Sequence, residues 1–593
     1  MMKIKRLFFV IAGCLAAGYA AADAQNESAT PMYSIEALDI PATSFGYGPF
    51  AVSMGEGESP DVVGLYEQFD FFSFFNLPPH QVDLGQKMYR HFSCRGNRIS
   101  SSYCDALWDG ANMAKAWRYS LYNGTPNLKS FLNQTIADDT DVIYTSLGND
   151  ASEGVGYRYD YDSSLSSYAN PTSYGIAKFN NKTFILKSPV IDREYGNILG
   201  SYASALGFVK LGDGRILVGG YSNFPSAKEQ FFYNCYAGND NSDGSYHFCP
   251  GHKMQATIWV IDPDRDPDGA EITGQQTQSY IDYTTNPTAM VSAAVTSFIK
   301  KGDDLYALGY SVTNDWGGAV NPSNTAVYWK LGLDGDTVNY ETVSEYPGMA
   351  RPGNQDNWNE YTWTVGANDN GYILANRKLA KAKNSNYAMN LAYTRLNDDG
   401  SFDTVSYPLY NDPFGGVNSE GAAINDNNFI VGWTDRRNDT RAVVGGSYRD
   451  TEALFYDINA GKYHYINDFI CHKDEAGNTD CRAEDGKYYH IQWAVDINNS
   501  NVIYATAFQY DTKSDWDNSI NATVKSVLLK PSEDAFIVDG DTGEQIVNES
   551  RKVTYNRAVV KNYSTKRGGS LGIGGLIMLI AASCFTLSGR RKF

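Results

Sequence analysis

A short motif that recurs through the chain constrains its fold more than any other feature of the sequence. The clearest copy is GAAINDNNFIVGWTD at residues 421–435, in which small residues precede a turn at Asn425 and Asp426 and a second segment ends in Gly432 and Trp433. Asn, Asp and Gly tolerate the positive φ angles that a tight turn between two twisted strands requires. Each copy of the motif therefore predicts a β-hairpin.

Six other segments fit the same pattern, with turns around Ser59, Asn149, Asp213, Asp303, Asn368 and Asn498. The turns are 57 to 90 residues apart, and several copies are followed by a strand with aromatic residues, such as TAVYWKLGLDG from Thr325. Repeated units of about four strands are typical of a β-propeller. We expect an all-β propeller of about seven blades, with six or eight also open. Tandem β-sandwiches are the alternative, although they would not explain the recurring hairpin.

One region near the N-terminus interrupts the repeat. Val82, Met88 and Phe92, and later Leu107 and Trp117, recur at roughly helical spacing. The sequence therefore predicts a small helical insertion at about 77–133, inside a propeller domain of residues 25–567.

The N-terminal segment has the pattern of an export signal. Three basic residues at positions 3–6 precede an apolar stretch over 7–18, and small residues at 22–24 form a cleavage site between Ala24 and Gln25. These features predict a secretory signal peptide over residues 1–24. The sequence IAGC at 11–14 also resembles a bacterial lipoprotein box, which leaves lipidation of Cys14 open.

The last 26 residues form a second targeting segment. Gly568, Gly569 and Ser570 precede a mostly apolar run at 571–587, and the basic cluster RRK at 590–592 follows it. The run is at the lower limit of length for a transmembrane helix, and its basic end would stay cytoplasmic. The arrangement resembles the GlyGly C-terminal sorting tail of Gram-negative bacteria, which a rhomboid-type protease, rhombosortase, recognises. The resemblance implies cleavage near Gly568, Gly569 or Ser570 and a cell-surface or extracellular product; a permanent inner-membrane anchor facing the periplasm is the alternative.

The cysteines outside the two targeting segments form three pairs that are close in sequence: Cys94 with Cys104, Cys235 with Cys249, and Cys471 with Cys481. Local pairs in polar, glycine-containing loops favour disulfides in an oxidising compartment. In the chain-entropy model, each such bridge contributes roughly 3 kcal/mol to stability. No C-x-x-C pair of the kind that zinc sites use occurs in the sequence.

The charge of the chain excludes one class of partner. It has 68 acidic and 49 basic residues and a net charge of −19, which becomes about −24 once both targeting segments are removed. Nucleic acids and anionic membrane surfaces require clustered Lys and Arg. We therefore expect no nucleic-acid partner, and contact with the membrane only through the C-terminal helix before processing.

The hairpins also carry a family resemblance. Asn-Asp turns with a trailing Val-Gly-Trp or similar resemble the HAF-type repeats of bacterial extracellular proteins, although Ala375 and Ala505 stand where Gly432 has its glycine. From signal peptide to sorting tail, the chain is similar to an uncharacterised secreted bacterial family, a domain of unknown function with GlyGly tails. The resemblance implies an exported repeat protein whose partners are the export machinery and a rhomboid-type sorting protease. It assigns no activity.

One acidic loop is a candidate calcium site. Asp264, Asp266 and Asp268 alternate before Gly269, and Glu271 follows closely. Alternating carboxylates around a glycine turn are the pattern of calcium loops. A more neutral copy lies in the loop between the second pair of cysteines, at Asn239, Asn241 and Asp243. An ordinary acidic turn is the alternative for both.

The sequence contains no strong catalytic motif. It lacks H-E-x-x-H, a phosphate-binding loop and sialidase-type boxes, and its one G-x-S-x-G match lies in the C-terminal tail. We therefore expect a secreted or surface-displayed binding module for a glycan or a surface protein, with candidate aromatic contacts at Trp358, Trp363, Trp516 and Tyr361. An exported hydrolase acting on polysaccharide or peptide is the alternative, since the spacing of catalytic carboxylates is set in space rather than in sequence.

Overall fold

The computed structural model describes most of the chain between residues 30 and 555. The described ranges are 30–44, 47–67, 128–136, 142–160, 172–189, 193–194, 197–198, 203–223, 254–277, 293–312, 324–341, 343–349, 359–379, 388–410, 416–436 and 451–555. The predicted signal peptide, Cys14 and the predicted sorting tail lie outside them. So do the processing residues Ala24, Gln25, Gly568, Gly569 and Ser570, four of the paired cysteines, the Asn239–Asp243 loop and Trp358.

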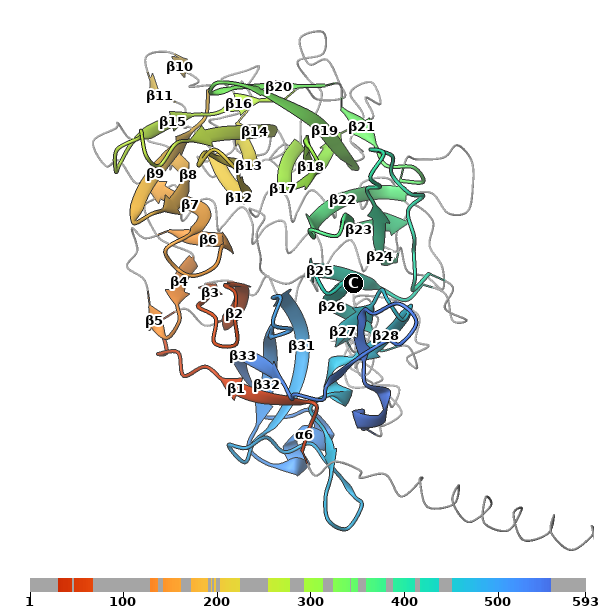
Figure 1. Cartoon of the computed structure of the whole chain (residues 1–593). Coiled ribbons are helices and arrows are strands. Elements are labelled where there is room, and N and C mark those ends of the chain that lie inside the picture. The colour runs from red at the N-terminus through yellow and green to blue at the C-terminus, as the bar shows by residue number, and fades with distance from the viewer. Residues whose placement is uncertain are drawn as a thin grey trace, which may run out of the picture.

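Seven small sheets of the described residues are arranged in a ring, as the blades of a β-propeller (Figure 1). From the inside outwards, blade 1 contains β2 (Tyr47–Met54), β3 (Val62–Glu67), β4 (Leu128–Leu132) and β5 (Thr135–Ile136). Blade 2 contains β6 (Ile143–Leu147), β7 (Gly154–Asp160), β8 (Thr172–Phe179) and β9 (Lys182–Lys187), and β15 (Glu271–Thr273) adds a parallel edge to β9. Blade 3 contains β12 (Ala203–Lys210), β13 (Ile216–Asn223), β14 (Met254–Ile261) and β16 (Gln275–Gln276).

The other four blades follow in chain order. Blade 4 contains β17 (Ala293–Lys301), β18 (Asp304–Val312) and β19 (Asn324–Asp334), with β20 (Thr337–Tyr340) and β21 (Ser344–Glu345) both paired to β19. Blade 5 contains β22 (Asn359–Ala367), β23 (Tyr372–Leu379) and β24 (Met389–Arg395). Blade 6 contains β25 (Ser419–Ile424), β26 (Phe429–Asp435), β27 (Thr451–Asp457) and β28 (Lys462–Tyr465). Blade 7 contains β31 (Tyr488–Ile497), β32 (Ile503–Tyr510), β33 (Thr523–Pro531) and β1 (Tyr33–Ala37).

Smaller elements lie outside the blades. They are the hairpins β10 (Arg193–Glu194)–β11 (Asn197–Ile198), β29 (His472–Lys473)–β30 (Thr479–Asp480) and β34 (Phe536–Val538)–β35 (Gln545–Val547), the helix α6 (Lys513–Asn518), and the 3₁₀ turns η3 (Ile466–Asp468) and η4 (Glu549–Arg551). None of the helices in the described ranges has the length and apolar character that a membrane-spanning segment requires.

The seven predicted hairpins are confirmed as the two innermost strands of the seven blades. The last blade is completed by the first strand, because β1 pairs antiparallel with β33 from Tyr33↔Pro531 to Ala37↔Val527. The ring is therefore closed by pairing between the two ends of the described chain.

The predicted helical insertion extends too far at its C-terminal end. Residues 77–127 lie outside the described ranges, but Leu128–Leu132 form β4, which pairs with β3 from Glu67↔Leu128 to Val63↔Leu132. These residues complete blade 1, because pairing with β3 determines their conformation.

Every innermost strand contains a β-bulge at the equivalent place. The bulges lie between Ala51 and Ser53, Tyr144 and Ser146, Ala205 and Gly207, Val295 and Ser297, Thr364 and Gly366, Gly421 and Ala423, and Ala494 and Asp496. The motif glycine of the second strand pairs with the residue before the bulge, as Gly432 does with Gly421. A Cβ at Gly432 would overlap the carbonyl oxygen of Glu420. The close approach of this carbonyl therefore accounts for the glycine in blade 6, whereas Ala375 and Ala505 occupy the equivalent position beside the bulges of blades 5 and 7.

One hydrophobic cluster has members from all seven blades. It includes Trp363, Trp433 and Trp493, which are at most 4% exposed, together with Leu147 and Leu206. Further clusters pack each blade against its neighbours. The aromatic residues of the repeats thus form the interior of the propeller.

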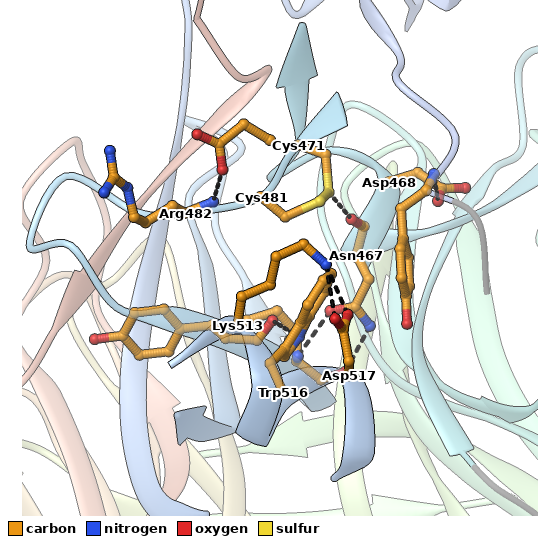
Figure 2. The surroundings of a disulfide bond; sticks show 12 residues. Asn467, Asp468, Cys471, Cys481, Arg482, Lys513, Trp516 and Asp517 are labelled. Carbon is orange, nitrogen blue, oxygen red and sulfur yellow. Dashed lines mark hydrogen bonds and ion pairs between the residues drawn. A yellow bond between two sulfur atoms is a disulfide. The ribbon is translucent and has the colours of Figure 1, made fainter. Parts of the chain in front are cut away.

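Blade 7 carries a disulfide between Cys471 and Cys481, the third pair expected from the sequence (Figure 2). The bridge closes the base of the β29–β30 hairpin, and both cysteines are buried in the cluster between blades 6 and 7. It therefore fixes the connection from blade 6 to blade 7.

Candidate functional site

A cavity of about 550 Å³ lies at the centre of the ring and is lined by residues from all seven innermost strands. The lining begins at the bulges and continues towards the hairpin turns, so the cavity occupies the end of the ring at which these hairpins turn. Leu147 and Leu206 line it and also belong to the central hydrophobic cluster, which forms its floor. Its volume is in the range of small-molecule sites in proteins.

The residue that directly follows each bulge lines this cavity. We call these seven equivalent residues the ring positions; they are Ser53, Ser146, Gly207, Ser297, Gly366, Ala423 and Asp496. Six of them are small and uncharged, which leaves the centre of the ring open. Asp496 alone places a charge at this level.

Asp496 is held by neutral donors from two blades. Its Oδ2 accepts hydrogen bonds from the Ser53 hydroxyl at 3.0 Å and from the Met54 amide at 2.9 Å. Its Oδ1 accepts from the Ile497 amide at 2.9 Å. The Ser53 hydroxyl in turn accepts from the amide of Leu147, in blade 2, at 3.2 Å. The carboxylate therefore links blade 7 to blade 1 and, through Ser53, to blade 2.

The surroundings of Asp496 favour its protonated form. Burial raises the pKa of its carboxyl to about 6, and the nearby charge of Glu56 adds to the effect, although the three hydrogen bonds oppose it. A carboxyl group with a pKa near neutrality is a recurring feature of functional sites.

The rim of the cavity is mostly acidic. Glu56, Glu153 and Asp369 line it together with a single cation among the described lining residues, Lys210. Lys210 is already paired, with its Nζ 2.5 Å from Oε1 of Glu153. The pKa of Asp369 is raised, first by burial and then by the charge of Asp426 in the next blade. The carboxylates of Glu56, Asp369 and Asp496 thus line the cavity, and the described lining contains no further cation that could pair with them.

Asparagines of the repeated turns connect neighbouring blades around this rim. The Nδ2 of Asn368 donates to the Asn425 carbonyl at 2.8 Å, that of Asn425 to the Asn498 carbonyl at 2.9 Å, and that of Asn498 to the Gly57 carbonyl at 2.7 Å. Each Oδ1 accepts from a backbone amide of its own turn, such as Phe429 for Asn425 at 3.0 Å. The repeated Asn is therefore a clamp between blades 5, 6, 7 and 1.

The described candidate calcium residues, Asp264, Asp266, Asp268 and Glu271, make contacts within the protein. Among the described residues, no group of three or more His, Cys, Asp or Glu side chains could hold a metal ion. The cations of the loop come from the protein: the Lys182 amine donates to the carbonyls of Pro263 and Asp266, at 2.5 and 3.1 Å. Glu271 pairs with Lys187 at 2.5 Å, and Asp268 accepts from the Thr183 amide at 2.8 Å. Asp264 contributes its amide to a turn, donating to Asp262 at 3.1 Å.

The aromatic residues expected to contact a ligand serve in packing where the structure describes them. Trp363 belongs to the central cluster. Trp516 stacks on Tyr488, with ring centroids 5.7 Å apart, and donates from its indole nitrogen to the Tyr489 carbonyl at 3.2 Å (Figure 2). The side chain of Tyr361 lies outside the described part. Trp363 and Trp516 thus serve in packing.

A second polar group, which the sequence analysis missed, lies in blade 6 at the ends of the strands away from the hairpin turn. Arg436 Nε is 2.8 Å from Oε1 of Glu452, which is fully buried. Trp433 Nε1 donates to Oε2 of the buried Glu420 at 3.2 Å. These contacts satisfy buried charges inside the blade, which is a structural role.

Comparison with known proteins places the chain in a family. A family model described as "Protein of unknown function (DUF3466)" matches residues 199–557, more than half of the chain. The chain belongs to the DUF3466 family. No curated protein matches it.

Several solved structures resemble this DUF3466 protein at low sequence identity and low TM-score. They include a protein of unknown function from Dyadobacter fermentans, with 8% identity and a TM-score of 0.32 over 64% of this chain and 92% of that one. Levansucrase from Bacillus subtilis has 9% identity and a TM-score of 0.25 over 61% and 89% of the two chains. The α-L-arabinanase of Penicillium chrysogenum has 13% identity and a TM-score of 0.25 over 60% and 89%. Likenesses of this size carry no argument about function.

The DUF3466 match contains the ring positions of blades 3 to 7, among them Asp496, and ends shortly after η4. Blades 1 and 2, which supply Ser53, Glu56 and Glu153, precede it. The residues that line the cavity thus come both from the matched segment and from the part of the chain before it.

Proposed function

We propose that this DUF3466 protein is an exported β-propeller that binds a small polar ligand in its central cavity. The observation that carries the proposal is the set of ring positions, where six small residues keep the centre open and one carboxylate is held inside. Apolar side chains at these positions would extend the hydrophobic core into this space; the small residues and the carboxylate instead leave it open and polar.

Cavity-filling substitution tests the proposal. No heavy atom lies within 4 Å of the position that a Cβ would take at Gly366, so Gly366→Leu would project into free space and fill part of the cavity. The purified protein would be screened by thermal shift against sugars, amino acids, amines and nucleosides. Ligands of the cavity raise the melting temperature of the wild type and leave that of Gly366→Leu unchanged. The absence of any such compound in a broad screen would refute the proposal.

A hydrolase is a second candidate, favoured by the raised pKa of Asp496 near the carboxylate of Glu56. General acid–base hydrolysis of a glycoside uses one protonated and one ionised carboxyl group. Incubation with a panel of oligosaccharides and peptides distinguishes the candidates. Turnover that Asp496→Asn abolishes establishes the enzyme, whereas binding without turnover establishes the binding module.

The export part of the proposal rests on the two terminal segments. Intact mass and location of the protein in its native cell would be compared between the wild type and a variant with Gly568 and Gly569 both replaced by Leu. Loss of the tail near Gly569, with surface exposure that the variant lacks, supports sorting. A retained tail in the wild type would make the protein an inner-membrane-anchored periplasmic one.

A further inference from the structure

The cavity has a charge pattern that restricts its ligand beyond the proposed function, on which this inference rests. Its described lining contains four carboxylates, of Glu56, Glu153, Asp369 and Asp496, and one amine, of Lys210. The amine is 2.5 Å from Glu153, so this pair is internally neutral. The net negative charge of the lining favours a cation in the space between them.

Asp496 is the deepest of these charges. It lies at the ring level, next to the apolar floor, whereas Glu56 and Asp369 lie three residues further along the chain in the turns of their blades. The groups that bond Asp496 in the described structure are a hydroxyl and two amides, all of them neutral. A half-buried carboxylate that has only neutral donors loses part of its hydration, and an opposite charge within about 4 to 6 Å offsets this loss.

The other ring positions indicate what kind of cation fits. Ser146 and Ser297 offer hydroxyls, and Gly366 and Ala423 leave room for bulk. The described lining has a single aromatic residue, Phe208, and so has no aromatic cage of the kind that quaternary ammonium groups require. A primary ammonium group, which can donate hydrogen bonds to a carboxylate and to hydroxyls, suits this surface better.

We infer that the ligand is a small molecule with a primary ammonium group, which pairs with Asp496 at the ring level. The remainder of the ligand extends towards the acidic rim formed by Glu56 and Asp369, so a second amine or a set of hydroxyls would be accommodated there.

Matched pairs of amines and neutral compounds test this inference. Isothermal titration calorimetry at pH 7.5 would use three amines with neutral counterparts: glucosamine with N-acetylglucosamine, 1,5-diaminopentane with 1,5-pentanediol, and spermidine with 1,8-octanediol. The wild type is expected to bind at least one of the three amines and to bind its neutral counterpart more weakly. Asp496→Asn is expected to lower amine affinity about 10- to 100-fold. Asp496→Ser, which introduces the commonest residue of the ring positions, provides a second variant if the first does not fold.

The control is Asp399→Asn, which removes the same charge from an exposed turn outside the cavity. It should bind as the wild type does. Equal binding of amines and neutral counterparts, an equal loss in the control, or no binding of any of the three amines would overturn the inference. A different result would refute the proposed function. It requires only that some compound in the screen raises the melting temperature of the wild type and not that of Gly366→Leu.

Discussion

The asparagine clamp makes a quantitative prediction about the stability of the ring. In Asn425→Ala the protein loses four hydrogen bonds: from Nδ2 to the Asn498 carbonyl at 2.9 Å and to the Asn501 side chain at 2.8 Å, and to Oδ1 from the amides of Asn427 at 3.2 Å and Phe429 at 3.0 Å. A hydrogen bond contributes about 1 kcal/mol net, and a buried group left without a partner costs more. We expect the free energy of unfolding to fall by about 3 to 5 kcal/mol.

A second variant separates the turn from the contact between blades. Asn425→Asp keeps the acceptors for the amides of Asn427 and Phe429, but it replaces the two donors by an oxygen that faces the Asn498 carbonyl. Repulsion between these oxygens should make Asn425→Asp at least as destabilising as Asn425→Ala at neutral pH.

The control is Asn397→Ala, since the hydrogen bonds of the Asn397 side chain to described residues stay within its own turn, to Ser401 at 3.3 Å and to Asp403 at 3.0 Å. It should cost about 1 kcal/mol or less. Urea denaturation followed by tryptophan fluorescence measures all three variants against the wild type. An Asn425→Ala variant no less stable than Asn397→Ala, or an Asn425→Asp variant as stable as the wild type, would refute the clamp.

Three further predictions concern single sites. Gly432→Ala should lower the free energy of unfolding by about 1 to 3 kcal/mol in urea denaturation, because the new methyl group meets the Glu420 carbonyl; a neutral effect would contradict the role of this close approach. Replacing Cys471 and Cys481 together by Ser should lower the free energy of unfolding by up to roughly 3 kcal/mol in the same assay, and an unchanged stability would contradict the role of this bridge. Because the pKa of Asp496 is raised to about 6, the folded state holds a proton that the unfolded state releases, so the contribution of Asp496 to stability falls between about pH 4 and pH 6. Burial and the charge of Lys552 lower the pKa of His464 to about 4, so His464 raises stability with rising pH over the same interval. The comparison with Asp496→Asn removes this contribution, because both proteins contain His464. The stability of the wild type minus that of Asp496→Asn should therefore fall with rising pH by up to about 3 kcal/mol, and a difference that does not change with pH would contradict the assignment.

The sequence predicted the fold because the repeat encodes its own geometry. Asn425, Asn368 and Asn498 are found at the turns where the motif places them, and Gly432 is explained by the close approach of the Glu420 carbonyl. The residues of a turn and a position that requires a small residue can both be recognised in a single sequence. Seven hairpins, and hence a propeller, could therefore be predicted.

The site was not predictable in the same way. Asp496 lies in AVDINNSN, where it resembles any polar residue before a turn, and its distinction emerges only when the seven ring positions are aligned on their bulges. Such an alignment of the repeats would have revealed one Asp among six small residues. Nothing in the sequence indicated the contact of Lys182 with the acidic loop, because Lys182 is about 80 residues before the loop and reaches its carbonyls only through the packing of blade 2. The burial of Trp363 was also not predictable, because the cluster that contains it has members from all seven blades.

The closure of the ring by β1 and β33 has a consequence for biogenesis. The hydroxyl of Ser34 bonds the carbonyl of Lys530, which is 496 residues away, so the last blade cannot assemble before nearly the whole chain is available. By the loop-closure relation, the entropic free-energy cost of this contact is only about 2 kcal/mol higher than that of a contact between adjacent blades. Its effect is on timing: a chain that crosses a membrane from its N-terminus onwards must leave β1 without a partner until β33 emerges. If the proposed export is correct, the exposed edge of β32 and the free strand β1 are then the segments that a periplasmic chaperone would have to protect from aggregation.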